Sequence, residues 1–315
     1  MSARAILGLS HTPLLGLNPL PAEADADLRG ALAEVSRHAR DFAPELVVIF
    51  APDHFNGFFH DMMPAICIGT EAEAIGDYGT LAGRVAVDGE SALGLVRALI
   101  GAGFDPAVSR RMVVDHGVAQ PLQLLFDSLE AVPVLPIFLN AAAPPAIPTV
   151  ARVVQLGRAV GRHFADDLRR ILYVGSGGLS HDPPIPTLDN PDAAMRERII
   201  VRQRATPEQR AARQTRVIQA GRDMAAGTSD RRALNAAWDT HVMDLLERGH
   251  WDGVHAIGED EIVREGGGSA HETKNWIAAF AAAATTTTRL RWYRAIPDLI
   301  AGFGVMFRDS PNAPA

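Results

Sequence analysis

The chain has 315 residues, of which 47% are hydrophobic and 21% are charged, and its formal net charge is −7. These values are typical of a soluble globular protein that is long enough for a sizeable buried core. The acidic balance excludes a basic surface for nucleic acid, so the composition favours a small molecule as the partner.

The single cysteine, Cys67, excludes an internal disulfide framework and a cysteine-rich zinc site. It lies in the apolar run MMPAICIG, where we expect a small buried side chain. No apolar stretch approaches the ~20 residues of a membrane helix. Polar Ser10 and His11 interrupt the first apolar run, which does not fit a signal peptide. We therefore expect a cytoplasmic protein without a membrane segment.

Strand-like and helix-like segments alternate along the first two thirds of the chain. Helical spacing of apolar residues predicts helices at 25–42, 89–103, 119–129 and 148–168. Short apolar runs predict strands at 5–10, 45–52, 65–69, 105–110, 132–140 and 169–178. This alternation predicts an α/β fold with a largely parallel or mixed central sheet that helices flank.

The last third has a different character. Residues 190–248 are rich in Arg, Ala, Glu and Gln and predict successive helices. A helix is expected at 271–284, after a glycine triplet, and strand structure is expected within 289–307. We therefore expect a single domain over 1–310 with a helical insertion at about 190–265, and a tail at 311–315.

Four histidines each follow a strand-like apolar run. They are His11 in GLSHTPL, His54 in APDHFNG, His116 in VVDHG and His181 in GSGGLSH, and the polar segment GGGSAHETKNW adds Glu272. Strand ends are where an open α/β sheet assembles its ligand site, so these side chains can converge. Imidazoles with one carboxylate are the ligand set of non-haem iron(II) oxygenases. The pattern predicts a metal site without naming its reaction.

Some of these residues could have a structural role instead of a functional one, and neighbouring aspartates could support the metal site. His11 could be a core histidine in a turn, and Glu272 could simply cap a helix. Asp53 could accept hydrogen bonds locally or support a metal-bound histidine, and Asp115 could orient the His116 ring. The glycines of GSGG would let backbone and ligand approach closely, but the P-loop lysine is missing.

Other chemistries have weaker signals. The sequence contains neither a GxSxG nucleophile elbow nor an HExxH zinc motif. The same ligands could nevertheless hold zinc and activate water for hydrolysis. A non-catalytic protein that binds a small molecule is the other alternative. His60 and His271 are close enough in sequence to line the site, but we do not expect either to be a metal ligand.

The segments LSHTPL, ELVVIFAPDHFNGFF, VDHGVAQPL, VPVLPIF, GSGGLSH and IAGFG resemble the class III extradiol ring-cleaving dioxygenases. The resemblance runs from about residue 5 to 305 and is greatest to the bacterial subgroup that acts on 2,3-dihydroxyphenylpropionate. It implies that His11, His54 and Glu272 hold Fe(II). It also implies that His116 is the proton donor and His181 the proton acceptor.

The resemblance further implies a catecholic substrate and O2. The enzyme would cleave 3-(2,3-dihydroxyphenyl)propionate, or its propenoate analogue, to a 2-hydroxy-6-oxo-nonadienedioate in aromatic catabolism. A homo-oligomer is expected, as in the family. A cation is expected near the substrate's carboxylate, and the sequence does not choose among Arg110, Arg111, Arg291 and Arg294.

Overall fold

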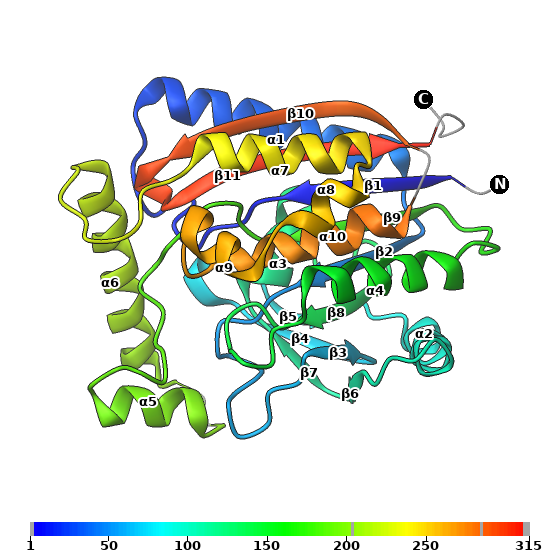
Figure 1. Ribbon diagram of the computed structural model, residues 1–315, viewed down its shortest axis with the longest axis horizontal. Coiled ribbons are helices and arrows are strands. Elements are labelled where there is room, and N and C mark those ends of the chain that lie inside the picture. The colour runs from blue at the N-terminus through cyan, green and yellow to red at the C-terminus, as the bar shows by residue number, and fades with distance from the viewer. Residues whose placement is uncertain (1–2, 203–204, 284–285, 311–315) are drawn as a thin grey trace.

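A mixed eight-stranded sheet forms the centre of the protein, as the computed structural model of the chain shows (Figure 1). The structure describes residues 3–202, 205–283 and 286–310. The strand order in the large sheet is β10-β11-β1-β9-β2-β8-β3-β6. These strands are β1 (Arg4–Leu9), β2 (Leu46–Ala51), β3 (Ile66–Gly69), β6 (Ala107–Ser109), β8 (Val134–Leu139), β9 (Ile171–Ser176), β10 (Thr287–Ile296) and β11 (Ala301–Asp309).

Helices cover both faces of this sheet. The helices are α1 (Ala22–Phe42), α2 (Gly89–Gly101), α3 (His116–Phe126), α4 (Val150–His163), α5 (Ala193–Ile200), α6 (Pro207–Ala225), α7 (Ala236–Arg248), α8 (Trp251–Ala256), α9 (Glu259–Glu261) and α10 (Thr273–Ala282). One hydrophobic cluster joins the sheet to α2, α4, α7, α8 and α10. A second cluster joins its other face to α1 and α3. The predicted α/β class with a mixed, helix-flanked sheet is therefore confirmed.

The elements expected in the last third are also present. Residues 190–248 contain α5, α6 and α7, and α5 and α6 stand at one end of the molecule (Figure 1). The segment expected to be strand-like forms two antiparallel strands, β10 and β11, and β11 pairs with β1. The tail at 311–315 lies outside the described residues. The limits of the domain and of its insertion remain predictions. None of the helices in the described ranges is long and apolar enough to cross a membrane.

A small second sheet is present that the sequence pattern did not predict. It has the order β5-β4-β7 and consists of β4 (Ala72–Ile75), β5 (Ala82–Val85) and β7 (Met112–Val114). These strands have only three or four residues each, which is too short for a periodic pattern to show. The sheet matters for function because β7 leads directly into His116 and the β4–β5 connection contains Asp77.

The parallel strands bring distant segments to one edge of the large sheet. β1, β9, β2 and β8 run parallel, and the register pairs Leu9 with Ser176 and Phe50 with Gly175. The carboxyl ends of β1, β2 and β9 are therefore level, and each of these three strands continues into a connection that contains a predicted site residue. This arrangement places the connections after β1, β2 and β9 side by side.

Glycines on β9 let α10 approach this edge closely. A Cβ atom at Gly175 would lie 2.6 Å from the carbonyl oxygen of Asn275. Gly177 has a φ of +145°, and a Cβ atom there would lie 2.7 Å from the Cβ atom of Glu272. The sequence suggested that these glycines let a ligand approach, but Glu272 and α10 occupy the space beside Gly175 and Gly177. The glycines thus bring Glu272 to the strand ends.

This packing predicts a large effect of one methyl group. Gly175→Ala should lower the free energy of unfolding by about 1–3 kcal/mol, because the added methyl group overpacks the contact between β9 and α10. Chemical denaturation of the metal-free protein measures this change.

Gly30→Ala is the matched control, since Gly30 lies within α1 and a Cβ atom there would meet nothing within 4 Å. It should leave stability unchanged or raise it by up to ~1 kcal/mol, as alanine is the better helix former. Equal stability of the Gly175→Ala variant and the unaltered protein would contradict the packing argument.

Candidate metal centre

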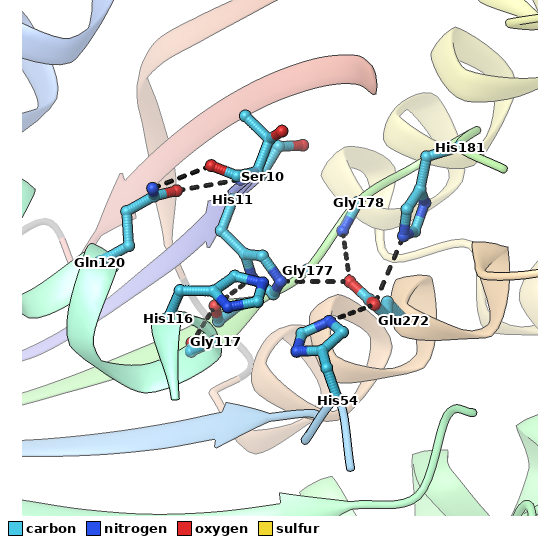
Figure 2. A network of polar contacts seen from close by, with 12 residues as sticks. Ser10, His11, His54, His116, Gly117, Gln120, Gly177, Gly178, His181 and Glu272 are labelled. Carbon is cyan, nitrogen blue, oxygen red and sulfur yellow. Dashed lines mark hydrogen bonds and ion pairs between the residues drawn. The ribbon is translucent and has the colours of Figure 1, made fainter. Parts of the chain in front are cut away.

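Five predicted side chains converge on one buried point, with the carboxylate of Glu272 at its centre (Figure 2). Glu272 Oε1 lies 3.1 Å from His54 Nε2 and 3.3 Å from His181 Nε2. Glu272 Oε2 lies 3.5 Å from His11 Nε2 and accepts a hydrogen bond from the backbone N–H of Gly178 at 3.0 Å. The structure thus brings together residues that the sequence separates by up to 261 positions.

A serine fixes the orientation of His11. The Ser176 hydroxyl donates its hydrogen to the carbonyl oxygen of Gly117. It can therefore only accept from His11, whose Nδ1 lies 2.9 Å from Ser176 Oγ. With its hydrogen on Nδ1, the His11 ring directs the lone pair of Nε2 toward Glu272.

Asp115 fixes the orientation of His54. Its Oδ2 atom accepts hydrogen bonds from His54 Nδ1 at 3.0 Å and from the His54 backbone N–H at 2.9 Å. Its Oδ1 atom accepts from the N–H of Gly117 and so caps α3. The hypothesis that Asp115 orients the His116 ring is therefore wrong, because both oxygens of Asp115 accept hydrogen bonds from His54 and Gly117 instead. Asp53 instead accepts three backbone hydrogen bonds within its own loop.

His116 is held by a residue that the sequence analysis did not single out. Its Nδ1 atom lies 2.6 Å from Asp77 Oδ2, and its Nε2 atom is buried without a hydrogen-bond partner among the described residues. Asp77 lies in the glycine-rich turn GDYG between β4 and β5, where Tyr78 has a φ of 49°. That turn follows no apolar run, so the only signal in the sequence was its two glycines.

His181 completes the group. Its Nδ1 atom donates to the carbonyl oxygen of Leu179 at 3.0 Å, so its Nε2 lone pair also faces Glu272. The preceding residue, Ser180, donates from its N–H and its hydroxyl to the buried carboxylate of Asp239. These bonds fix the backbone that carries the His181 ring.

The charges of these groups depend on one another. Burial lowers the pKa of His11 to about 3. Burial also lowers the pKa of His54 and of His181, but the neighbouring carboxylates outweigh burial, and both pKa values lie above the usual one. Burial raises the pKa of Glu272, but the imidazoles of His181, His11 and His54 outweigh it and hold that pKa well below its usual range. The carboxylate is therefore ionised and attracts positive charge.

The donor atoms fit a bound metal ion. The Nε2 atoms of His11, His54 and His181 each direct a lone pair at a carboxylate oxygen, which can only accept hydrogen bonds. Such a contact requires a cation between the two acceptors, either a proton or a metal. His11, His54 and His116 also offer nitrogen atoms that all lie within 4.8 Å of one another. Geometry alone leaves Glu272, His116 and His181 as alternatives for the third ligand.

The imidazoles and Glu272 line a pocket beside the cluster. Apolar residues form much of the remaining wall, namely Leu14, Pro183, Pro184, Ile185, Val217, Leu299, Ile300 and Ala301. Concave sites with an apolar wall and a few convergent polar groups are typical of sites that bind small organic molecules. Tyr78 and Arg213 also line the pocket.

The sequence analysis named other residues that do not reach this pocket. Arg291 pairs with Asp244 and Glu247, and Arg294 pairs with Glu23 and Asp27. Arg110 and Arg111 are exposed, and Arg111 lines a hollow beside the small sheet. All four arginines were therefore wrong candidates for contact with a ligand in this pocket.

Neither additional histidine lines the pocket. His60 stacks on Phe55, with 5.4 Å between the ring centroids. His271 lies beside Glu259 and Lys274, and burial together with Lys274 lowers its pKa to about 4. Cys67 is buried in β3, as expected.

Comparisons with known proteins place this chain in a family. The family model described as the catalytic LigB subunit of aromatic ring-opening dioxygenase matches residues 5–304. The chain belongs to this family. It is accordingly an aromatic ring-opening dioxygenase, an enzyme class that takes an aromatic substrate and O2, and the enzymes of this family use a metal.

Curated relatives match over nearly the whole chain. A 2,3-dihydroxyphenylpropionate/2,3-dihydroxicinnamic acid 1,2-dioxygenase from Comamonas testosteroni is 49% identical and covers 96% of both chains. A protein of the same name from a Rhodococcus species is 46% identical, again over 96% of both chains. The crystal structure of an uncharacterized protein from Escherichia coli K12 matches with a TM-score of 0.52 and 12% identity, over 98% of this chain and 100% of that one. That last likeness shows the fold alone.

The hydrogen bond from His11 to Ser176 predicts an effect on metal affinity. Ser176→Ala should weaken the binding of a divalent metal about 10–100-fold, because the His11 ring loses the acceptor that fixes its tautomer. Titration of the metal-free protein with Fe(II) under anaerobic conditions measures this affinity.

Ser36→Ala is the control, since the Ser36 hydroxyl donates to the carbonyl oxygen of Leu125 and bonds to none of the four clustered histidines. It should bind the metal as tightly as the unaltered protein. Thermal melting of both variants separates a loss of affinity from a loss of structure. Unchanged affinity in a folded Ser176→Ala variant would show that the serine does not support a ligand.

Proposed function

We propose that this protein is an Fe(II)-dependent extradiol dioxygenase that cleaves the ring of 3-(2,3-dihydroxyphenyl)propionate and of its propenoate analogue. The product would be a 2-hydroxy-6-oxo-nonadienedioate, formed in aromatic catabolism. The names of the curated relatives support the substrate. The observation that carries the chemistry is the convergence of imidazole nitrogens on the Glu272 carboxylate, beside a pocket with an apolar wall.

In this proposal His11, His54 and Glu272 hold the metal. Two imidazoles and one carboxylate are the ligand type of non-haem iron(II) oxygenases. Fe(II), when bound, supplies the redox chemistry that couples a catechol to O2. The Nδ1–H groups of His11 and His54 are each committed to an acceptor, so both rings keep Nε2 for the metal.

His181 is the proposed proton acceptor. Its Nδ1–H is fixed on the Leu179 carbonyl, so Nε2 is the basic nitrogen, and it lines the pocket where a catechol hydroxyl would lie. The neighbouring Glu272 carboxylate stabilises the imidazolium that forms when Nε2 takes the hydroxyl proton. A positioned imidazole suits this step because it titrates near neutral pH.

His116 is the proposed proton donor. Asp77 holds its Nδ1–H and balances the charge of an imidazolium. Such an imidazolium carries a second proton on Nε2, a buried atom that has no hydrogen-bond partner among the described residues, and His116 lines the pocket. From there the proton can assist cleavage of the O–O bond, after which both oxygen atoms remain in the ring-opened product.

The protein is further proposed to act as a homo-oligomer in the cytoplasm, as expected from the sequence. A zinc hydrolase could use the same donor atoms. The family and the relatives favour the dioxygenase, because every relative compared above is named as a dioxygenase, apart from the uncharacterized protein.

Substitutions should separate metal ligands from proton carriers. His11→Ala, His54→Ala and Glu272→Ala should each lose bound iron. His116→Gln and His181→Gln should keep iron and lower turnover about 10²–10⁴-fold, the usual contribution of general acid–base catalysis. Iron content after anaerobic loading and gel filtration, with oxygen uptake on the same samples, measures both effects.

The iron content of two of these variants would contradict the assignment if it differed from the expected value. Full iron occupancy in Glu272→Ala would remove Glu272 from the ligand set. Loss of iron from His116→Gln would instead make His116 a ligand, as the close approach of its nitrogen to His11 and His54 allows.

The reaction itself is tested by loading the metal-free protein with Fe(II), or with Zn(II), and then adding O2 and a panel of 3-substituted catechols. The iron form should consume O2 and form a yellow ring-fission product, with 3-(2,3-dihydroxyphenyl)propionate as the best substrate. The zinc form should be inactive because zinc has no redox chemistry. Iron-loaded protein that consumes no O2 with any catechol would overturn the proposed function.

A further inference from the structure

Arg213 is the only arginine or lysine among the described residues that line the pocket. It lies on α6, far along the chain from the segments that carry the histidines and Glu272. Its side chain is half-buried. A cation in a pocket with an apolar wall is costly to desolvate unless it has an anionic partner, which makes Arg213 a candidate for contact with a ligand.

Most of the hydrogen-bonding capacity of Arg213 is unused by the described residues. Its Nη2 atom donates to the carbonyl oxygen of His54 at 3.0 Å, and this is its only hydrogen bond there. No carboxylate of the described ranges lies within 4.0 Å of it, whereas Arg291 and Arg294 are both paired. A guanidinium has five N–H donors in a fork that matches a carboxylate.

The bond to His54 also fixes where a ligand anion would lie. It places the guanidinium beside the backbone of a proposed metal ligand, in the pocket that the histidines and Glu272 also line. Apolar residues such as Val217 and Ile300 form the wall along which the ring and methylene groups would lie. Tyr78 lines the same pocket, and its hydroxyl makes no hydrogen bond to a described residue.

Neighbouring arginines on α6 do not share this position. Arg210 donates to the carbonyl oxygen of Ala205, and Arg216 is exposed. Neither lines the pocket that contains the histidines. Arg216 follows Arg213 by three positions, close to one turn of the helix, so it offers a matched comparison on the same element.

We propose that Arg213 binds the carboxylate of the substrate's side chain and so selects catechols that carry a short anionic substituent. This inference rests on the proposed function, and it names the residue that sets its specificity. In this arrangement the diol is bound beside the histidines and Glu272, and the anion of the side chain is bound by Arg213. A catechol that lacks the anion leaves the guanidinium without its partner.

Two substrates of equal length test this role. Arg213→Met should raise KM for 3-(2,3-dihydroxyphenyl)propionate about 10–100-fold, the usual effect of losing a charge-assisted hydrogen-bonded pair. KM for the uncharged primary amide of that substrate should change by less than about threefold, and kcat should stay similar for both. Arg213→Lys keeps the charge without the fork and should give an intermediate KM for the carboxylate.

Arg216→Met is the control and should leave both substrates unaffected. A parallel loss for carboxylate and amide in Arg213→Met would overturn the proposal, because it would show that Arg213 merely ties α6 to the His54 loop. Unchanged kinetics with the carboxylate would overturn it as well. Circular dichroism and thermal melting confirm that each variant is folded.

A binding measurement separates this inference from the proposed reaction. 3-Phenylpropionate has the side chain but no hydroxyl groups, so calorimetry on the protein tests the anion site without turnover. Affinity should fall at least about tenfold in Arg213→Met and stay the same in Arg216→Met. This result would support the anion site even if no catechol were cleaved. Equal affinity in both variants would overturn it even if catechols were cleaved.

Discussion

The site depends on a buried carboxylate that faces the lone pairs of imidazole nitrogens. Glu272 is ionised, and the Nε2 atoms of three histidines point at its oxygens. Acceptors in contact repel one another unless a cation lies between them. The residues that support these three rings strengthen this demand, because the Ser176 hydroxyl, the Asp115 carboxylate and the Leu179 carbonyl each accept an Nδ1–H and leave the Nε2 lone pair directed at Glu272.

Small residues in the sheet make that arrangement possible. Glu272 lies at the start of α10, and α10 can reach the strand ends only because β9 has glycine where its backbone meets the helix. The indole of Trp276 then donates to the carbonyl oxygen of Gly177 and ties helix and strand together. Close packing of backbone on backbone thus sets the position of a side chain in the site, which links the stability of the fold to its chemistry.

The pocket is lined by two chemically different polar groups. The imidazoles and the carboxylate of Glu272 form the group that fits a metal and a diol. Arg213 supplies a cation on the wall beside His54. An apolar wall contributes contact area but little orientation, whereas polar groups at fixed positions decide which way round a ligand lies. Recognition of the diol by the histidine cluster and of an anion by Arg213 would hold the ring in one orientation relative to the metal.

The sequence by itself determined the fold class and the five residues of the centre. Buried strands must be apolar throughout, so a histidine directly after such a run stands out, as His11 and His54 do. Only the tertiary structure decided the partners. It assigned Asp115 to His54 and Asp77 to His116, and it brought Arg213 into the pocket. The reason is physical: apolar periodicity is local, whereas a hydrogen-bond partner depends on which loops meet once the sheets and helices have packed.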